Sequence, residues 1–368
     1  MSIPVLRRLM TAAVFALTTA AVVVVPATTM TRGAAAGAVP CPAPRGDVVR
    51  SAPGAGKTVA LTFDDGPSTF TPQILRILRA YDVRATFFQT GAHVSARPGL
   101  AAQVAAEGHL IADHTYDHRY PREVSGGWTW AYLTDQFTRT NRLIRSVAGQ
   151  QPCFFRPPGG YQTTGMVRAA ASRGMSTVMW SVDTEDWKQP GQTSAAFTAR
   201  IVARATAGSN QSHPVLLMHD GKASHEPEWQ VSANRSNDVK ALPAILSYYK
   251  SRGYRFVDLL GRSGLPPGPT RLSLTSPNHS VAAGTTTTVV AGHLAAITGG
   301  VRGVPVRWYS RRPGAATWKS RGTVWTNRYG NIRVLARPTV QTQYTLRFWG
   351  TDHFWRAGTP GSRTVSPY

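Results

Sequence analysis

The chain has 368 residues and carries 41 Lys and Arg against 18 Asp and Glu, a formal net charge of +23. A hydrophobic content of 42% excludes an intrinsically disordered chain, and two cysteines exclude both a disulfide-dense scaffold and a cysteine-based zinc finger. The charge favours anionic partners, and the length allows about two domains.

The N-terminal segment has the layout of an export signal. Arg7 and Arg8 precede an uncharged run over Leu9–Val25, and small residues over 33–38 offer cleavage sites. The alternative is an uncleaved membrane anchor, since the run lies at the short limit for spanning a bilayer. We expect a signal peptide over 1–38, a secreted or cell-wall-associated protein, and no stable membrane span after cleavage.

Export also bears on the two cysteines. In an oxidising compartment Cys41 and Cys153 can form a disulfide, the alternative being two unpaired thiols. The bond would tie the N-terminal segment to the main domain, and the chain-entropy model gives about 4–5 kcal/mol for so long a loop.

Strand-like and helix-like patterns alternate after a Pro-, Gly- and Ala-rich stretch, which we expect to be a linker over 39–56. The predicted strands are 59–63, 85–88, 109–112, 154–155, 177–182, 215–218 and 254–257. The predicted helices are 71–81, 100–107, 132–147, 165–173, 195–207 and 239–252. Such alternation predicts an α/β domain over 57–262, built from βα units in a parallel sheet or barrel.

A second linker, 263–269, is rich in proline and glycine, and the helical pattern stops after it. Residues 270–368 contain short strand-like runs separated by Gly, Pro and Asn turns, which predict a small β-sandwich. This segment holds 13 Lys or Arg and one acidic residue, so the positive charge is densest here.

Five short motifs follow predicted strands, which is where parallel α/β folds place active sites. The first motif, 62–67, contains Asp64 and Asp65. Neighbouring residues on an extended chain point opposite ways, so the two carboxylates should have different roles. Taken alone, such a sequence is as often a turn with solvated acids.

The second motif, 114–118, contains His114 and His118. These histidines share a face if the segment is helical, and with one carboxylate they form a two-histidine, one-carboxylate metal set. The third motif, 154–160, offers Arg156 to a carboxylate, and its Pro-Pro-Gly-Gly turn offers N–H groups to a developing oxyanion. A surface turn is the alternative for the third motif.

The fourth motif, 180–187, contains acids that can orient a histidine and tryptophans that can line a sugar or acyl pocket. In the fifth, 216–220, His219 follows a buried strand and is placed for proton transfer. Core histidines and core tryptophans are the alternatives. A loop with Glu226, Glu228 and Trp229 follows, which could border the same cleft, a surface loop being the alternative.

The order and spacing of the five motifs over 57–260 resemble the polysaccharide deacetylase family, also called NodB-homology or carbohydrate esterase family 4. The resemblance implies a distorted (β/α) barrel. It also implies a metal-dependent hydrolase, usually with Zn²⁺, that removes acetyl groups from N-acetylglucosamine polymers or acetylated xylan. Co²⁺ or Mn²⁺ could replace zinc in such a site.

The resemblance also implies a role for each matching residue. The metal ligands would be Asp65, His114 and His118. Asp64 would be the general base, balanced by Arg156, and His219 the general acid, oriented by Asp186. Trp187 and Leu217 would line the acetyl pocket, and the Gly159 N–H would bind the oxyanion. The family often has tyrosine at position 159, so glycine leaves the substrate preference open.

Three functions remain at this point. An N-deacetylase acting on peptidoglycan or chitin-type glycans is the first, and an acetylxylan esterase is the second. The third is a wall-binding protein with an inactive enzyme domain, which would require the loss of a ligand or catalytic group. Residues 270–368 resemble immunoglobulin-like modules, whose basic surface would suit anionic cell-wall polymers. We expect a monomer and no nucleic-acid partner, since no nucleic-acid motif accompanies the charge.

Overall fold

The computed structural model describes residues 40–188, 194–266, 268, 270–296, 299–351, 357–359 and 361–368. The expected signal peptide lies outside these ranges. Within them, no helix combines the length and the apolar composition needed to cross a membrane.

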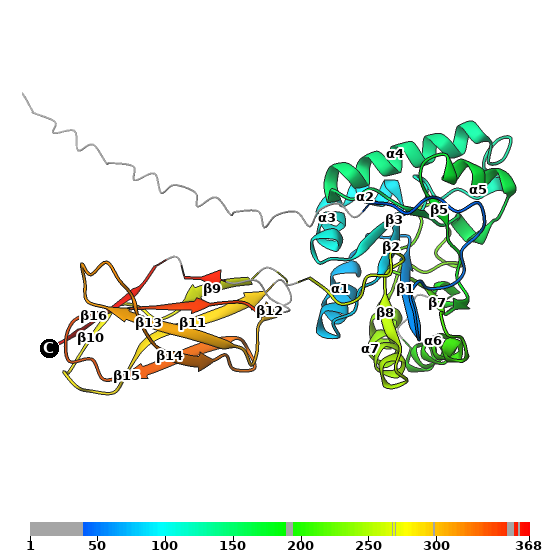
Figure 1. Ribbon diagram of the computed structural model, residues 1–368. Helices are drawn as coiled ribbons and strands as arrows, with labels where there is room; N and C mark the ends of the chain where they lie inside the picture. Colours follow the sequence, from blue (N-terminus) through cyan, green and yellow to red (C-terminus); the bar gives the residue numbers. More distant parts are fainter. Residues whose placement is uncertain are drawn as a thin grey trace, which may run out of the picture. The chain divides into compact units, whose positions relative to one another are not determined.

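The first part of the described chain is a curved, parallel β-sheet with helices around it (Figure 1). Its strands follow the order β5-β4-β3-β2-β1-β7-β6, with β8 also paired to β1. These strands are β1 (Thr58–Asp64), β2 (Thr86–Gln89), β3 (Leu110–Asp113), β4 (Phe154–Phe155), β5 (Ser176–Thr177), β6 (Val182–Asp183), β7 (Val215–His219) and β8 (Arg255–Val257). The helices are α1 (Thr71–Ala80), α2 (Gly91–Ala96), α3 (Pro98–Ala106), α4 (Trp130–Ala148), α5 (Thr164–Ala171), α6 (Ala195–Ala207) and α7 (Ser236–Ser251). The predicted α/β class is confirmed, in the form of an open half-barrel.

The two faces of strand β1 have different surroundings: one packs against the helices, and the other carries Asp64 at its end. Val59, Leu61 and Phe63 join an apolar cluster that includes buried residues of α1, α3, α4, α6 and α7. Ala60 belongs to a second cluster on the opposite face. Because side chains alternate along a strand, Asp64 at the end of β1 lies on the face of Ala60, away from the helices.

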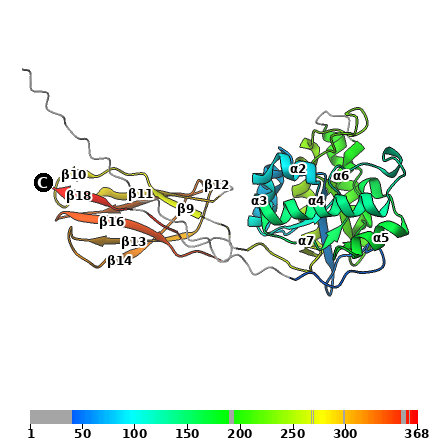
Figure 2. The same cartoon turned by 90° about the horizontal axis from the view of Figure 1, so that it is seen from above.

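Helix α4 shows how local signals set an element. The side chain of Thr129 accepts a hydrogen bond from the Tyr132 N–H at 3.2 Å and so caps the N-terminus. Gly149, at φ 66, ends the helix in the left-handed conformation. The helix runs across the domain in Figure 2. It packs on the sheet, where the centres of the Phe137 and Phe155 rings lie 4.6 Å apart. Both helix ends therefore follow from residue types that the sequence displays.

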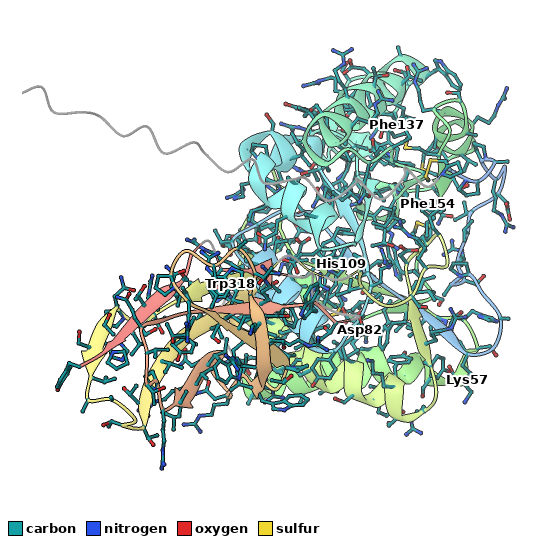
Figure 3. All side chains as sticks on the ribbon, turned by 60° about the vertical axis from the view of Figure 1, so that its left-hand side comes forward. Lys57, Asp82, His109, Phe137, Phe154 and Trp318 are labelled. Atoms are coloured by element: carbon teal, nitrogen blue, oxygen red, sulfur yellow. A yellow bond between two sulfur atoms is a disulfide. The ribbon has the colours of Figure 1, made fainter. Side chains whose placement is uncertain are left out.

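Within the predicted linker over 39–56, a few residues contact the sheet, although most of residues 40–56 are exposed. Val49 forms a parallel bridge with Val178, and Ala52 is buried. Cys41 and Cys153 are joined by a disulfide, and the sulfur atoms are yellow in Figure 3. These contacts join residues more than 100 positions apart in sequence, which local composition does not reveal.

The predicted strand 177–182 is also corrected, since it divides into β5 and β6. The carbonyl oxygens of Val178 and Met179 accept hydrogen bonds from the Arg156 guanidinium at 3.2 and 3.4 Å. A buried cation therefore takes the acceptors that a continuous ladder would use.

The last part of the chain is all-β, as expected. One sheet has the order β10-β18-β16-β13-β14 with β17 on β16, and the other has the order β12-β11-β15 with β9 on β11. The strands are β9 (Thr270–Leu274), β10 (His279–Val281), β11 (Thr287–Ala296), β12 (Gly299–Gly300), β13 (Pro305–Arg311), β14 (Lys319–Trp325), β15 (Asn331–Ala336), β16 (Thr342–Phe348), β17 (Ala357–Gly358) and β18 (Arg363–Pro367). Both sheets contribute to one apolar core, which contains Val290, Val306 and Leu346.

Candidate active site

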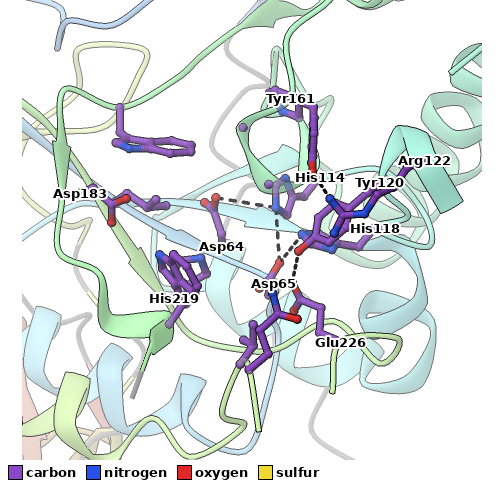
Figure 4. A pocket seen from close by; sticks show the side chains of 18 residues that line it. Asp64, Asp65, His114, His118, Tyr120, Arg122, Tyr161, Asp183, His219 and Glu226 are labelled. Carbon is purple, nitrogen blue, oxygen red and sulfur yellow. Dashed lines mark hydrogen bonds and ion pairs between the residues drawn. The ribbon is translucent and has the colours of Figure 1, made fainter. Parts of the chain in front are cut away.

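A pocket of about 390 Å³ lies at the carboxyl ends of strands β1, β3, β6 and β7 (Figure 4). Parallel sheets place their strand ends together, so motifs far apart in the sequence meet here. Eight of the predicted site residues line the pocket: Asp64, Asp65, His114, His118, Gly159, Trp187, Leu217 and His219. The other two predicted residues, Arg156 and Asp186, lie behind them and are fully buried.

Asp65, His114 and His118 form a buried cluster whose ligand atoms lie within 4.8 Å of one another. Asp65 Oδ1 is 3.4 Å from His114 Nε2 and 3.2 Å from His118 Nε2. Residues 114–118 are not helical, contrary to the condition attached to the histidine spacing. Left-handed backbone at Thr115 (φ 64) and His118 (φ 60) turns a loop so that both rings converge.

The two adjacent aspartates also differ from expectation, because both face the pocket. Asp65 has φ 69 and therefore leaves the alternation of the strand. Its backbone is held tightly: a Cβ on Gly221 would lie 2.3 Å from the Asp65 carbonyl oxygen, and one on Gly66 would lie 2.2 Å from Asp220 Oδ1. His93 Nδ1 lies 2.6 Å from the same carbonyl oxygen. This close packing explains how an unfavourable conformation persists at the site.

The cluster suits a cation. His114 Nδ1 lies 2.7 Å from the carbonyl oxygen of Arg156, which can only accept, so Nδ1 carries a proton and Nε2 faces Asp65. Burial opposes the charged form of His114, but the carboxylates of Asp64 and Asp65 outweigh it and raise the pKa of the ring. Burial lowers the pKa of His118 to about 3, which keeps its ring neutral and available as a ligand. Asp65 Oδ1 is buried and has no hydrogen-bond partner among the described residues, so a metal ion would satisfy it.

Asp64 is oriented by a buried arginine. Arg156 Nη1 donates to Asp64 Oδ1 at 2.7 Å and to Thr62 Oγ1 at 2.8 Å. The guanidinium also packs on the Phe88 ring, 4.1 Å from its centre. The other carboxylate oxygen, Oδ2, is 3.7 Å from His114 Nε2 and is free to act in the pocket.

His219 is held in the same way by a buried carboxylate. Asp186 accepts from the His219 backbone N–H at 2.7 Å and lies 2.8 Å from ring Nδ1, which leaves Nε2 to the pocket. Burial favours the neutral ring, but the Asp186 carboxylate outweighs it and raises the pKa of His219 to about 9. The ring is therefore charged near neutral pH and can donate a proton.

Comparison with known proteins decides the family. The model of the family described as polysaccharide deacetylase matches residues 51–178. A peptidoglycan-N-acetylglucosamine deacetylase of Bacillus cereus is 37% identical over 217 residues, which cover 58% of this chain and 92% of that protein. The chain belongs to the polysaccharide deacetylase family.

Two further similarities each span a little more than half of this chain. A chitooligosaccharide deacetylase of Bradyrhizobium sp. is 34% identical over 201 residues, 54% of this chain and 87% of that protein. The crystal structure of the Bc1960 peptidoglycan N-acetylglucosamine deacetylase has 32% identity and a TM-score of 0.48, and covers 58% of this chain and 90% of that one.

One wall of the pocket comes from residues that the motifs do not include. A Cβ at Gly159 would lie 2.8 Å from Tyr120 Cε1 and 3.1 Å from Tyr161 Cε2, so two tyrosines pack where the glycine leaves space. Arg122 Nη1 donates to the Tyr161 hydroxyl at 2.6 Å. The sequence carried one usable signal: Tyr120 follows His118 by two residues.

The loop after the fifth motif borders the pocket through Glu226. The Tyr120 hydroxyl donates to Glu226 Oε1, and burial raises the pKa of this carboxyl. Gln230 also lines the pocket, whereas the Trp229 side chain is exposed. The loop therefore contributes polar groups to the pocket wall.

Proposed function

We propose that this protein is a secreted, metal-dependent hydrolase that removes the N-acetyl group from N-acetylglucosamine units of peptidoglycan or chitin-type glycans. Its catalytic domain would span 57–262, and an immunoglobulin-like β-sandwich would span 270–368. One observation carries the proposal: a buried Asp-His-His cluster lies beside an arginine-held carboxylate and a carboxylate-held histidine. Membership of the family supports hydrolysis of acetyl groups on a polysaccharide.

Asp65, His114 and His118 would hold the metal ion. We propose Zn²⁺, with Co²⁺ or Mn²⁺ as alternatives, because two neutral imidazoles and one carboxylate suit all three. Such an ion supplies Lewis acidity toward a carbonyl oxygen and lowers the pKa of a water molecule.

Asp64 and His219 would move the two protons of the reaction. Asp64 takes a proton from the attacking water as the new C–O bond forms, and Arg156 holds the carboxylate in place. The developing oxyanion lies near the Gly159 N–H. His219 Nε2 then donates a proton to the leaving nitrogen as the C–N bond breaks, which releases acetate and the free amine. Asp186 keeps the ring charged until this step.

The raised pKa of His219, the proposed general acid, bears on whether the substrate is an amide or an ester. An amide nitrogen leaves only when it is protonated, whereas an alkoxide leaves from an ester more readily. A histidine whose pKa is raised to about 9 by a buried carboxylate therefore suits an amide. The relatives named above act on peptidoglycan N-acetylglucosamine and on chitooligosaccharide, which supports the same class here. Acetylxylan remains the alternative substrate.

Secretion is supported by the layout of residues 1–38 and by the disulfide, which belongs to oxidising compartments. Attachment to the cell wall would follow from the basic β-sandwich, since anionic wall polymers attract it.

Acetate release tests the proposal. Purified protein is incubated with chitopentaose, N-acetylated peptidoglycan or acetylxylan, with and without added zinc. Zinc-dependent release from either N-acetylated glycan is expected. Release from acetylxylan alone would select the esterase, and no release from metal-loaded protein would favour the wall-binding protein.

A further inference from the structure

The charge of the C-terminal sheets has no counterpart within them. Residues 270–368 contain 13 Lys or Arg and one acidic residue, Asp352. All ion pairs among the described residues lie between Arg45 and Arg262. Within the part of the chain that the structure describes, no carboxylate therefore forms an ion pair with these basic residues, and an external anion can.

Two of the arginines face each other across a strand pair. Val306 and Leu346 point into the core, so Arg307 and Arg347, one residue further along each strand, point outward. Arg307 and Arg347 are direct register partners, and both are exposed. Like charges placed directly opposite each other destabilise a sheet. An anion bound across the pair would remove this repulsion.

The same outer face holds two guanidinium groups in defined positions. Arg347 lies over the Tyr309 ring at 5.3 Å, and Arg311 lies over the Trp318 ring at 4.5 Å (Trp318 is labelled in Figure 3). Arg311 also donates from Nε to Gln343 Oε1 at 2.9 Å. Stacking and hydrogen bonding of this kind reduce the entropy that each arginine would lose on binding.

These groups surround a hollow of about 250 Å³. Its lining includes arginine and aromatic side chains together with threonines and a glycine. The residues that line it and matter here are Arg311, Trp318, Thr345, Arg347, Thr359 and Gly361.

We propose that this hollow binds one phosphate of a phosphodiester-linked polyol chain. The Arg307–Arg347 pair at its edge would bind a neighbouring phosphate of the same chain. The guanidinium fork matches phosphate oxygens, and a phosphodiester stays charged at any pH near neutral. A flexible polyol phosphate chain can adjust its path so that successive phosphates reach the hollow and the Arg307–Arg347 pair, whereas the phosphates of a nucleic-acid duplex are held at a fixed spacing. The inference rests on the proposed function only for the location of the protein at a cell wall, where such a chain would hold the enzyme near its substrate.

Binding of poly(glycerol phosphate) to the full-length protein tests the inference. The variant R311Q/R347Q removes the two stacked guanidinium groups, and R333Q/R337Q removes the same charge from exposed residues on and beside β15. We expect R311Q/R347Q to weaken binding about tenfold or more and R333Q/R337Q to weaken it less than about twofold. Equal weakening would show diffuse charge attraction, and unchanged binding in R311Q/R347Q would also overturn the site.

Two further arms keep the result interpretable. R311K/R347K keeps the charge and loses the planar fork, so it should still bind clearly more weakly than the unmodified protein; full binding would contradict an arginine site. Thermal unfolding of each variant shows whether it is folded. Tighter binding to a carboxylate polysaccharide, duplex DNA or anionic vesicles than to poly(glycerol phosphate) would overturn the phosphodiester assignment.

Catalysis is measured separately on soluble chitopentaose. R311Q/R347Q should release acetate from it at the rate of the unmodified protein. If the proposed deacetylation fails for every variant, the binding measurement still stands, so the two proposals fail independently.

Discussion

Asp64 and His219 are direct register partners on the neighbouring parallel strands β1 and β7. The Asp64 carboxylate is held by Arg156 at 2.7 Å, and the His219 ring is held by Asp186 at 2.8 Å. The proposed base and acid are thus placed by backbone pairing and oriented by buried partners of opposite charge. A slip of one residue between these strands would move one of them to the opposite face of the sheet.

Replacing Asp64 by Asn should abolish turnover and leave the metal content unchanged. The amide cannot take a proton from water, and general-base catalysis contributes about 10²–10⁴-fold. Acetate release measures the rate, and elemental analysis measures the metal. Loss of the metal in D64N would mean instead that Asp64 is a ligand.

The alkaline limb of the pH profile should report His219. Its pKa is raised to about 9, so kcat/KM should fall as the pH rises through that value. The same charged pair stabilises the fold fully below about pH 6.5, the ordinary histidine value, and this contribution is lost as the pH rises through about 9.

The variant D186N tests this assignment. Without the carboxylate the His219 pKa should drop, and the alkaline limb should move to lower pH. D183N is the control, because Asp183 also lines the pocket but interacts with His219 through charge alone, with no hydrogen bond between them among the described residues. If the alkaline limb of the pH profile stays at the same pH in D186N, the titration belongs to another group.

Removal of the metal should abolish acetate release and lower the melting temperature, because ligand binding to the folded state alone stabilises it. H118Q should lose the metal. H225Q is the matched control, since the centre of the His225 ring lies 5.5 Å from that of His118, in a tilted arrangement, and His225 is not part of the cluster. Equal zinc titrations of H118Q and the unmodified protein would remove His118 from the ligand set.

The steric and backbone effects of replacing Gly159 by alanine can be measured separately. Gly159 and Gly149 have φ values of 60 and 66, so alanine at either position carries the strain of the left-handed region, about 1–2 kcal/mol. Only at 159 would the new Cβ meet a neighbour, Tyr120, at 2.8 Å. G159A should therefore cost about 1–3 kcal/mol more than G149A and lower kcat/KM.

The double variant G159A/Y120A should recover most of that difference in unfolding free energy, measured by urea titration. Additive losses would show that Tyr120 does not fill the space beside Gly159.

Much of the architecture could be predicted from local patterns. The alternation of apolar runs and helical spacing determined the α/β class, because burial of strand faces and helix stripes leaves a periodic trace. The motifs at strand ends determined which residues meet, since parallel strands end together. The helix over 195–207 matches α6 residue for residue, with Ser194 capping its first turn.

Only the tertiary structure shows the features of the site and fold that depend on contacts between segments distant in the sequence. The sequence could not show that Asp65 turns back beside Asp64, because its left-handed backbone is held by Gly66, Gly221 and Asp220. Nor could it place Tyr120 against Gly159, or the segment around Val49 on the sheet. These arrangements come from close packing between parts of the chain that share no local pattern, and composition and spacing carry no record of them.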